Sequence, residues 1–273
     1  MRRLAFIVSF LALAAAGTAF AFRAVIKDAV ASRLKPTLPV AVPYLPPPAE
    51  TATKTPAEPT PAPAPAPTPA PAPTPVPKPP VSTTSQGVNL AVPFTSQAPK
   101  ADWSLPYQEA CEEASMIMVN AYYKGTGAFT PDEADRQILA LVAWEKDTFG
   151  FYEDTTADEV ARIGREYYGY KNTSAVAIRS IDDVKKQVAL GVPVILPAAG
   201  RLLHNPYFSG QGPLYHMLVV KGYTKDGKII TDDPGTRRGA DYLYDPAVLW
   251  NAVHDWNGGD VEHGRKVMVV VKK

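Results

Sequence analysis

The chain has 273 residues and a nearly balanced charge, with 28 Lys and Arg against 27 Asp and Glu. This balance excludes the strongly basic proteins whose overall field attracts nucleic acid, so we expect no nucleic-acid partner. The single cysteine, Cys111, excludes an intramolecular disulfide and a zinc site built from several cysteines.

The N-terminus has the pattern of an export segment. Arg2 and Arg3 precede an apolar run, Leu4–Phe22, and Ala19-Phe20-Ala21 has the small residues of a cleavage site. The run is also about long enough to cross a bilayer, so a cleaved signal peptide and an uncleaved membrane anchor both stay open. In either case residues 1–22 would place the rest of the chain outside the cytoplasm, secreted or held at the cell surface.

Residues 23–87 form a predicted linker. Of the 29 prolines, 19 lie within Pro36–Pro80, and proline occupies every second position over Pro61–Pro77. Proline fixes φ and restricts the residue before it, so this stretch favours an extended polyproline II spacer with nothing to bury. What remains, residues 88–273, is enough for one domain with its own core.

The first half of this domain carries helix signals after a short predicted strand at Val92–Phe94. Thr130 and Thr156 each begin a capping box, and Gly125 and Gly169 are placed to end the helices that precede them. Apolar residues recur at helical spacing between these signals. We expect helices from near 108 to 124, from 131 to about 146, over 157–168 and over 181–190.

In the second half the period changes from helical to extended. A hairpin is predicted around Lys225-Asp226-Gly227, and Asp245-Pro246 caps a short helix through Val253. Helices followed by a mainly antiparallel sheet indicate an α+β fold. The predicted strands are 192–196, 216–223, 228–231, 241–244 and 265–272.

Cys111 lies at the N-terminus of the first long predicted helix. A helix N-terminus stabilises the thiolate, which is the reactive form of cysteine. Such a nucleophile works with an imidazole that takes its proton and with a carboxylate or amide that orients the imidazole. His216 at a strand start and Asp233 after the next strand are candidates. The alternatives are a buried structural cysteine, a structural histidine and an ordinary Asp-Asp-Pro-Gly turn.

The register of the hairpin decides whether His216 and Asp233 meet. A tight two-residue turn would leave His216 about four residues beyond the position opposite Asp233. A loop over residues 222–227 would instead pair Lys221 with Lys228 and place His216 opposite Asp233. The catalytic interpretation therefore predicts the longer loop.

Four motifs resemble a known family when they are taken in order: Val92–Gln97, Cys111 at a helix start followed by Ala114-Ser115, Tyr215–Tyr223, and Asp232–Gly235. They look like the papain-like cysteine peptidases related to the bacteriocin-leader (double-glycine) peptidases. The resemblance covers most of residues 88–273. It implies a papain-like fold and a thiol protease activity that uses no metal or organic cofactor.

By this resemblance Cys111 would be the nucleophile, His216 the base and Asp233 the residue that orients the histidine. Gln97 would donate to the oxyanion together with the Cys111 amide, and Gln108 is the second candidate for that role. The substrate implied is a peptide or a cell-wall amide.

Three further residues, Asn205, Tyr207 and Tyr215, are candidates for lining a substrate groove. His254 and His263 flank a polar loop, but their spacing matches no standard metal site, so we expect a solvated turn there.

One departure from the family concerns Glu112-Glu113, which follows Cys111 where Gly-Pro is usual. Negative charge beside a thiolate raises its pKa and weakens the nucleophile.

The sequence leaves three functions open: a hydrolase that forms a thioester acyl-enzyme, an acyl transferase of the cell-wall amidase or transglutaminase type, and an inactive papain-like module that binds a surface polymer or partner.

Overall fold

The computed structural model describes residues 37–46 and 87–273. The predicted export segment, residues 1–22, and most of the predicted linker lie outside these residues. Within the described ranges, no helix combines the length and the apolar character needed to cross a bilayer.

The strands form one sheet in which every neighbouring pair of strands is antiparallel. The central strands β3 and β4 are buried along nearly their whole length. The order across the sheet is β2 (Ser174–Ala177), β7 (Val267–Val270), β3 (Val194–Ala199), β4 (Tyr215–Tyr223), β5 (Ile229–Asp232) and β6 (Tyr242–Tyr244), and β1 (Val88–Asn89) also pairs with β4.

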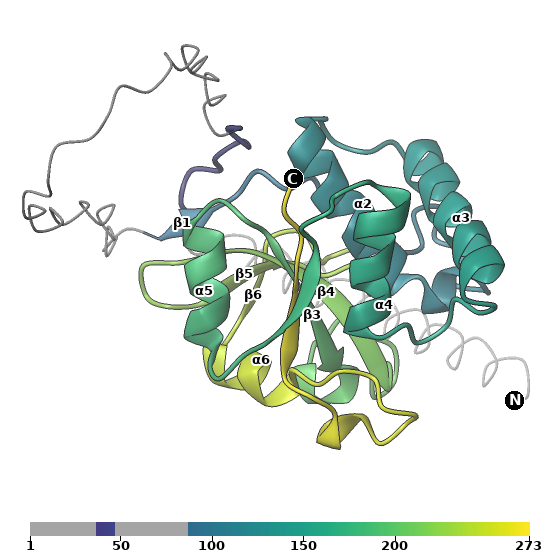
Figure 1. Ribbon diagram of the computed structural model, residues 1–273. Helices are drawn as coiled ribbons and strands as arrows, with labels where there is room; N and C mark the ends of the chain where they lie inside the picture. The colour runs from purple at the N-terminus through teal and green to yellow at the C-terminus, as the bar shows by residue number, and fades with distance from the viewer. Residues whose placement is uncertain (1–36, 47–86) are drawn as a thin grey trace, which may run out of the picture. The chain divides into compact units, whose positions relative to one another are not determined.

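The helices α2, α3 and α4 gather on one side of the ribbon (Figure 1), where α2 and α4 pack directly against the sheet. Helix α2 packs against β4, and α3 packs against α2. The helical elements are η1 (Tyr107–Glu109), α2 (Cys111–Lys124), α3 (Pro131–Thr148), α4 (Ala157–Arg162), the π-helical turn η2 (Ile163–Tyr167), α5 (Ile181–Ala189), η3 (Gly200–Leu203), α6 (Pro246–Ala252) and η4 (Val261–His263).

This arrangement confirms the α+β class and the helix boundaries to within a few residues. Thr130 and Thr156 each form both hydrogen bonds of a capping box. Gly125 ends α2 in the left-handed conformation at φ 64°. That conformation suits glycine because it has no Cβ to clash with the backbone.

Helix α2 is the central element of the core, because every residue from Cys111 to Tyr123 is buried. Burial on all sides is typical of a helix that lies inside a protein rather than on its surface. Its buried residues include the ionisable side chains of Glu112 and Glu113. The element that carries the candidate nucleophile therefore has little freedom to move.

Two strand predictions need correction. The first strand is β1 at Val88–Asn89 and not Val92–Phe94, where Pro93 has no N–H to give to a ladder. Strand β2 (Ser174–Ala177) was not predicted, since Ser-Ala-Val-Ala has a single β-branched residue and no aromatic residue to mark a strand. It pairs with β7 at the edge of the sheet.

A segment before the proline-rich stretch also contacts the domain, although we predicted that residues 23–87 form a linker. Val42 forms a parallel bridge with Leu90. The Tyr44 ring packs edge-on against Tyr122 and Tyr123, with ring centroids 5.7 and 4.8 Å apart. The folded unit therefore includes residues 39–46 in addition to residues 87–273.

The register of β4 and β5 matches neither predicted alternative. Next to the turn, Gly222 pairs with Ile230, and a β-bulge follows in β4 at Lys221. The predicted pairing of Lys221 with Lys228 is therefore wrong, because Lys221 has no partner in β5.

The bulge decides which face of the sheet Asp233 occupies. Beyond the bulge, Val219 lies opposite Asp232, so the pairing has shifted by one residue. Side chains alternate along a strand, and the shift therefore puts Asp233 on the same face as His216. Without the bulge the two side chains would lie on opposite faces.

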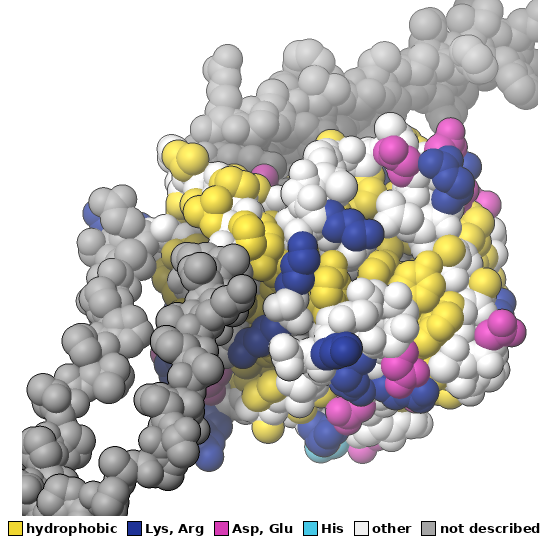
Figure 2. Space-filling model, turned by 45° about the horizontal axis from the view of Figure 1, so that its top comes forward, with side chains coloured by type: hydrophobic (Ala, Val, Ile, Leu, Met, Phe, Trp, Pro, Cys, Tyr) yellow, Lys and Arg dark blue, Asp and Glu magenta, His cyan; other side chains and the backbone are white. Residues whose placement is uncertain are grey.

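The surface shows no concentration of one charge on the face in Figure 2. Lys and Arg side chains there are interspersed with Asp, Glu and hydrophobic side chains. This distribution agrees with the formal net charge of +1.

Candidate active site

Cys111 is the first residue of α2 and follows η1 and Ala110. Ala110 supplies no side-chain acceptor to the first amides of the helix, and these amides have no intrahelical partner. The backbone N–H of Cys111 is therefore available to an acceptor in front of the helix. The partial positive charge of the helix end lies at the same place.

The thiol of Cys111 donates a hydrogen bond to Glu112 Oε2, at 2.9 Å from sulfur to oxygen. Burial raises the pKa of the thiol well above its usual value, and the charge of Glu112 raises it further. The backbone N–H of Met217, next to His216 in β4, hydrogen-bonds the sulfur and opposes this pKa shift. The resting state is therefore a neutral thiol.

Asp233 is completely buried, and both of its carboxylate oxygens accept hydrogen bonds. Oδ1 lies 2.8 Å from His216 Nε2 and 3.0 Å from the backbone nitrogen of Gly235. Oδ2 accepts from the Tyr244 hydroxyl at 2.6 Å and from Asn205 Nδ2 at 3.0 Å. His216 and Asp233 thus meet as the catalytic interpretation predicted, by way of the bulge and the turn after β5.

These donors keep Asp233 ionised. Burial alone would raise its pKa, but the charge of His216 and the hydrogen bonds from His216, Tyr244 and Gly235 outweigh burial and lower it. A buried carboxylate with this many donors is a fixed negative charge.

The imidazole of His216 is held on two sides. The edge of Phe208 packs against the ring at 5.3 Å between ring centroids. Gly235 lies so close that an added Cβ would come within 2.8 Å of His216 Cε1. Because Nε2 engages Asp233, Nδ1 is the ring nitrogen that can accept a proton from a thiol.

Cys111 and His216 line the same cleft, which has a volume of about 470 Å³. The two residues are brought together by the packing of α2 against β4. In the described part of the chain, the thiol is hydrogen-bonded to Glu112 and not to His216. A proton transfer to His216 therefore requires rotation of the thiol away from Glu112.

Gln97 lies beside this site but its amide is engaged. Its Nε2 donates to the carbonyls of Tyr107 and Gln108, each at 2.9 Å, which holds η1 in front of Cys111. To reach an oxyanion, the Gln97 amide would have to release one of these bonds. Gln108 also lines the cleft, and its side chain donates to Glu109 at 3.0 Å.

The three predicted groove residues occupy different places. Tyr215 lines the cleft, and its hydroxyl lies 3.2 Å from Asp255 Oδ1. Tyr207 lines a neighbouring hollow. Asn205 is buried behind the site and donates to Asp233, so the structure gives it a supporting position and corrects its predicted place in the groove.

Sequence reasoning missed several groups around the site. Tyr244, the strongest neutral donor to Asp233, lies on β6 and has no local motif that marks it. Glu145 packs its carboxyl against that of Glu113 beneath the N-terminus of α2, and burial raises the pKa of both, to about 8 for Glu145. Asp154 lines the cleft, with its pKa raised to about 6 by burial and neighbouring carboxylates.

The loop between α6 and β7 shows two histidines with separate partners. His254 Nδ1 lies 2.9 Å from the Gly264 carbonyl, and the exposed His263 lies 2.8 Å from Asp260. Among the residues that the structure describes, no group of three or more potential metal ligands is present.

The model of the Peptidase_C39 like family matches residues 89–257, which is more than half of the chain. This match confirms the resemblance inferred from the four motifs. Comparison with curated protein sequences gives no match.

Among solved structures, a C39-like peptidase from Bacillus anthracis is similar at 16% identity and a TM-score of 0.39, over 69% of this chain and 98% of that one. A prointerpain A fragment from Prevotella intermedia is similar at 16% identity and a TM-score of 0.36, over 54% of this chain and 45% of that one.

Proposed function

The chain belongs to the Peptidase_C39 like family, and on that premise we propose that it is an active cysteine peptidase with Cys111, His216 and Asp233 as its catalytic residues. One observation carries the proposal. A buried, fully hydrogen-bonded Asp233 lies 2.8 Å from His216 Nε2, and His216 lines one cleft with the sole cysteine.

The chemistry that this arrangement suits is acyl transfer through a thioester. His216 Nδ1 takes the thiol proton, and the sulfur bonds to the carbonyl carbon of the substrate. The tetrahedral oxyanion accepts a hydrogen bond from the Cys111 N–H. When the C–N bond breaks, the amine leaves with the proton from His216. Water then attacks the thioester, gives its proton to His216 and releases the acid and the thiol.

The proposal is tested by the alkylation of the thiol, since Cys111 is the only cysteine and every label reports on it. We expect iodoacetamide to label Cys111 at neutral pH despite the raised pKa of its thiol, because His216 can accept the thiol proton once the sulfur turns away from Glu112. His216→Ala should slow this labelling, whereas His263→Ala, an exposed histidine outside the cleft, should leave the rate unchanged.

His216→Ala should also lose the hydrolysis of a mixed peptide substrate, and His263→Ala should keep it. A labelling rate unchanged by His216→Ala, together with the absence of peptide hydrolysis, would contradict the proposal.

The hydrogen bond from Cys111 to Glu112 favours a second candidate, an inactive member of the family that binds a surface polymer or partner. A carboxylate in contact with the thiol opposes thiolate formation, which is the property that a nucleophile needs. In this case the wild-type protein and Cys111→Ala should bind a peptide or cell-wall polymer equally, and neither should release product.

We propose further that the domain acts outside the cytoplasm. The support is the sequence pattern of Arg2, Arg3 and the apolar run Leu4–Phe22, followed by a proline-rich spacer. Fractionation of cells that express the full chain should place it in the membrane or the extracellular fraction. Sequencing its N-terminus would separate a cleaved signal from an anchor, and recovery in the cytoplasm would contradict the proposal.

A further inference from the structure

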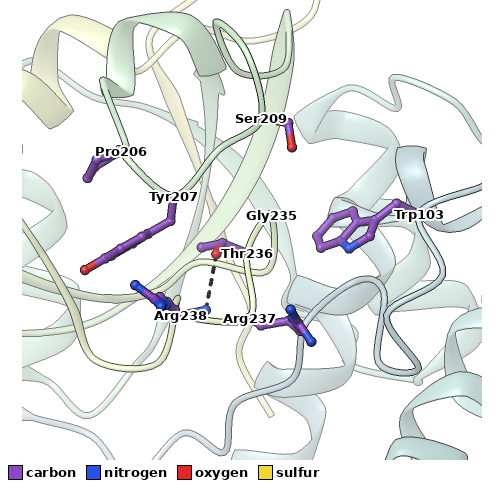
Figure 3. Close-up of a pocket in the computed structure, with 8 residues that line it drawn as sticks. All are labelled: Trp103, Pro206, Tyr207, Ser209, Gly235, Thr236, Arg237 and Arg238. Atoms are coloured by element: carbon purple, nitrogen blue, oxygen red, sulfur yellow. Dashed lines mark hydrogen bonds between the residues drawn. The ribbon is translucent and has the colours of Figure 1, made fainter. Parts of the chain in front are cut away.

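A second hollow lies next to the active-site cleft and has a volume of about 620 Å³. Trp103 and Tyr207 lie on opposite sides of it, and Arg237 and Arg238 lie along the edge between them (Figure 3). We call this hollow the arginine pocket. It has two aromatic walls and two cationic groups.

The arginine pocket and the active-site cleft are parts of one groove. Trp103, Ser209 and Gly235 line both hollows. Gly235 also packs directly against the His216 ring. The arginine pocket therefore lies directly beside the imidazole of His216.

Charge is divided along this groove. Among its described lining residues, the active-site cleft has the carboxylates Glu109, Glu112 and Asp154 and no Lys or Arg. The arginine pocket has Arg237 and Arg238 and no Asp or Glu. A bound peptide would thus meet negative charge on the Cys111 side and positive charge beyond His216.

The turn that aims Asp233 at His216 also carries the arginines. The Asp233 backbone nitrogen donates to the Gly239 carbonyl at 3.0 Å, which closes the turn at its base. At its tip, the Arg238 backbone nitrogen donates to the Thr236 hydroxyl at 3.2 Å (Figure 3). These bonds hold the arginines at a set position relative to the catalytic pair.

The guanidinium group of Arg237 is suited to a carboxylate, and Arg238 lies beside it. Arg238 lies over the ring of Tyr207 at 5.0 Å from its centroid, which orients the planar group. Arg237 makes no ion pair with any carboxylate in the described part of the chain. Guanidinium groups bind carboxylates through paired N–H donors.

We propose that the arginine pocket is a substrate subsite that binds a carboxylate of the peptide, from an acidic side chain or from a free C-terminus, at the end of the cleft beyond His216. The inference rests on the proposed peptidase function for the identity of the ligand. It adds a substrate class: peptides with negative charge a short distance to one side of the scissile bond.

The test measures binding to the full chain carrying Cys111→Ala, so that no turnover is needed. One pair of probes is a blocked five-residue alanine peptide with a central Glu and its Gln counterpart. A second pair is five alanines with a free C-terminal carboxylate and the same peptide as an amide. We expect at least one carboxylate peptide to bind about fivefold or more tightly than its neutral partner.

The double substitution Arg237→Gln with Arg238→Gln should remove this preference, while Arg179→Gln, an exposed arginine away from the groove, should retain it. Circular dichroism would establish that the double variant is folded. The pair of peptides that shows the preference identifies the source of the carboxylate.

Equal affinities within both pairs would overturn the subsite, as would a preference that survives the loss of both arginines. If the preference holds but the wild-type protein hydrolyses no peptide, the subsite stands and the peptidase proposal fails.

Discussion

Buried carboxyl groups on the two sides of the cleft have pKa values that are shifted in opposite directions. On the sheet side, Asp233 is buried and its pKa is lowered. On the helix side, Glu112, Glu113 and Glu145 are buried at the N-terminus of α2 and beneath it, and their pKa values are raised. Burial is common to both walls, so it does not explain the difference.

Hydrogen-bond donors explain it. Asp233 receives bonds on both oxygens from a histidine, a tyrosine, an amide side chain and a backbone N–H. The carboxyl groups of Glu113 and Glu145 bond mainly to each other, and the Glu113 backbone N–H is the further donor to the pair. The sheet side therefore holds a permanent negative charge at Asp233, whereas the buried Glu113–Glu145 pair on the helix side holds a proton.

The largest effect is expected from Asp233→Ala. The substitution leaves His216, Tyr244 and Asn205 without their common acceptor in a buried site, so the free energy of unfolding should fall by about 3 kcal/mol. Peptide hydrolysis should fall by about a hundredfold or more, because the imidazole loses its orientation. Urea unfolding and rate measurements would test both.

Asp233→Asn is the matched variant, since it keeps the shape of the side chain. It should be less destabilising than Asp233→Ala and still strongly impair hydrolysis. Full activity in the asparagine variant would contradict the role of the negative charge.

The second prediction concerns the pH dependence of stability through Glu145, whose pKa is raised to about 8 by burial. The unfolded carboxyl loses its proton near pH ~4.3 while the folded one keeps it, so this contribution to stability is complete below that pH and is lost as pH rises through about 8. Glutamine does not ionise, so Glu145→Gln should not lose stability as the pH rises through this range.

We therefore expect Glu145→Gln to match the wild type at about pH 4 and to exceed its free energy of unfolding by about 2 kcal/mol at about pH 9. Denaturant unfolding at both values provides the measurement. Glu166→Gln, an exposed carboxylate paired with Arg162, is the control and should change little. An unchanged pH slope in Glu145→Gln would mean that the buried pair does not hold a proton.

The third prediction concerns Glu112. Burial is the larger cause of the raised pKa of the Cys111 thiol, and the charge of Glu112 raises it further. Glu112→Gln should lower that pKa and increase the rate of iodoacetamide labelling at neutral pH by about tenfold. Glu109→Gln removes a carboxylate from the same cleft without touching the sulfur and should have a smaller effect. Equal rates in the two variants would show that Glu112 does not restrain the thiol.

Much of the fold could be predicted because its signals are local. The capping boxes at Thr130 and Thr156 and the glycine at position 125 mark helix ends through interactions within a few residues. Strand β2 and the docking of Tyr44 depend instead on distant partners, namely β7 and the rings of α2. No pattern in the neighbouring sequence predicts this strand or this docking.

The candidate site divides in the same way. Cys111, His216 and Asp233 could be selected because their residue types and order limit the chemistry, and the structure brings His216 and Asp233 together. The register argument failed because a bulge at Lys221 has no reliable sequence mark. The supporting role of Asn205 could not be foreseen, since it depends on a loop that folds behind Asp233.

The smallest expected effect comes from Tyr244→Phe, which removes one of the donors to Asp233 and leaves the others. The free energy of unfolding should fall by about 1 kcal/mol, because one buried oxygen keeps a single donor from Asn205. The pKa of Asp233 should rise toward its ordinary value, since a bond to its charged form is lost.

A carboxylate with a lowered pKa stabilises the folded protein above its unfolded pKa of about 3.9 and loses that contribution as pH falls through the folded value. Tyr244→Phe should therefore unfold at a higher pH than the wild type in an acid titration. Tyr242→Phe, on the same strand but without a bond to Asp233, is the matched control. If both variants unfold at the pH of the wild type, the hydroxyl of Tyr244 does not help to keep Asp233 charged, and the remaining donors are sufficient for the contrast between the two walls.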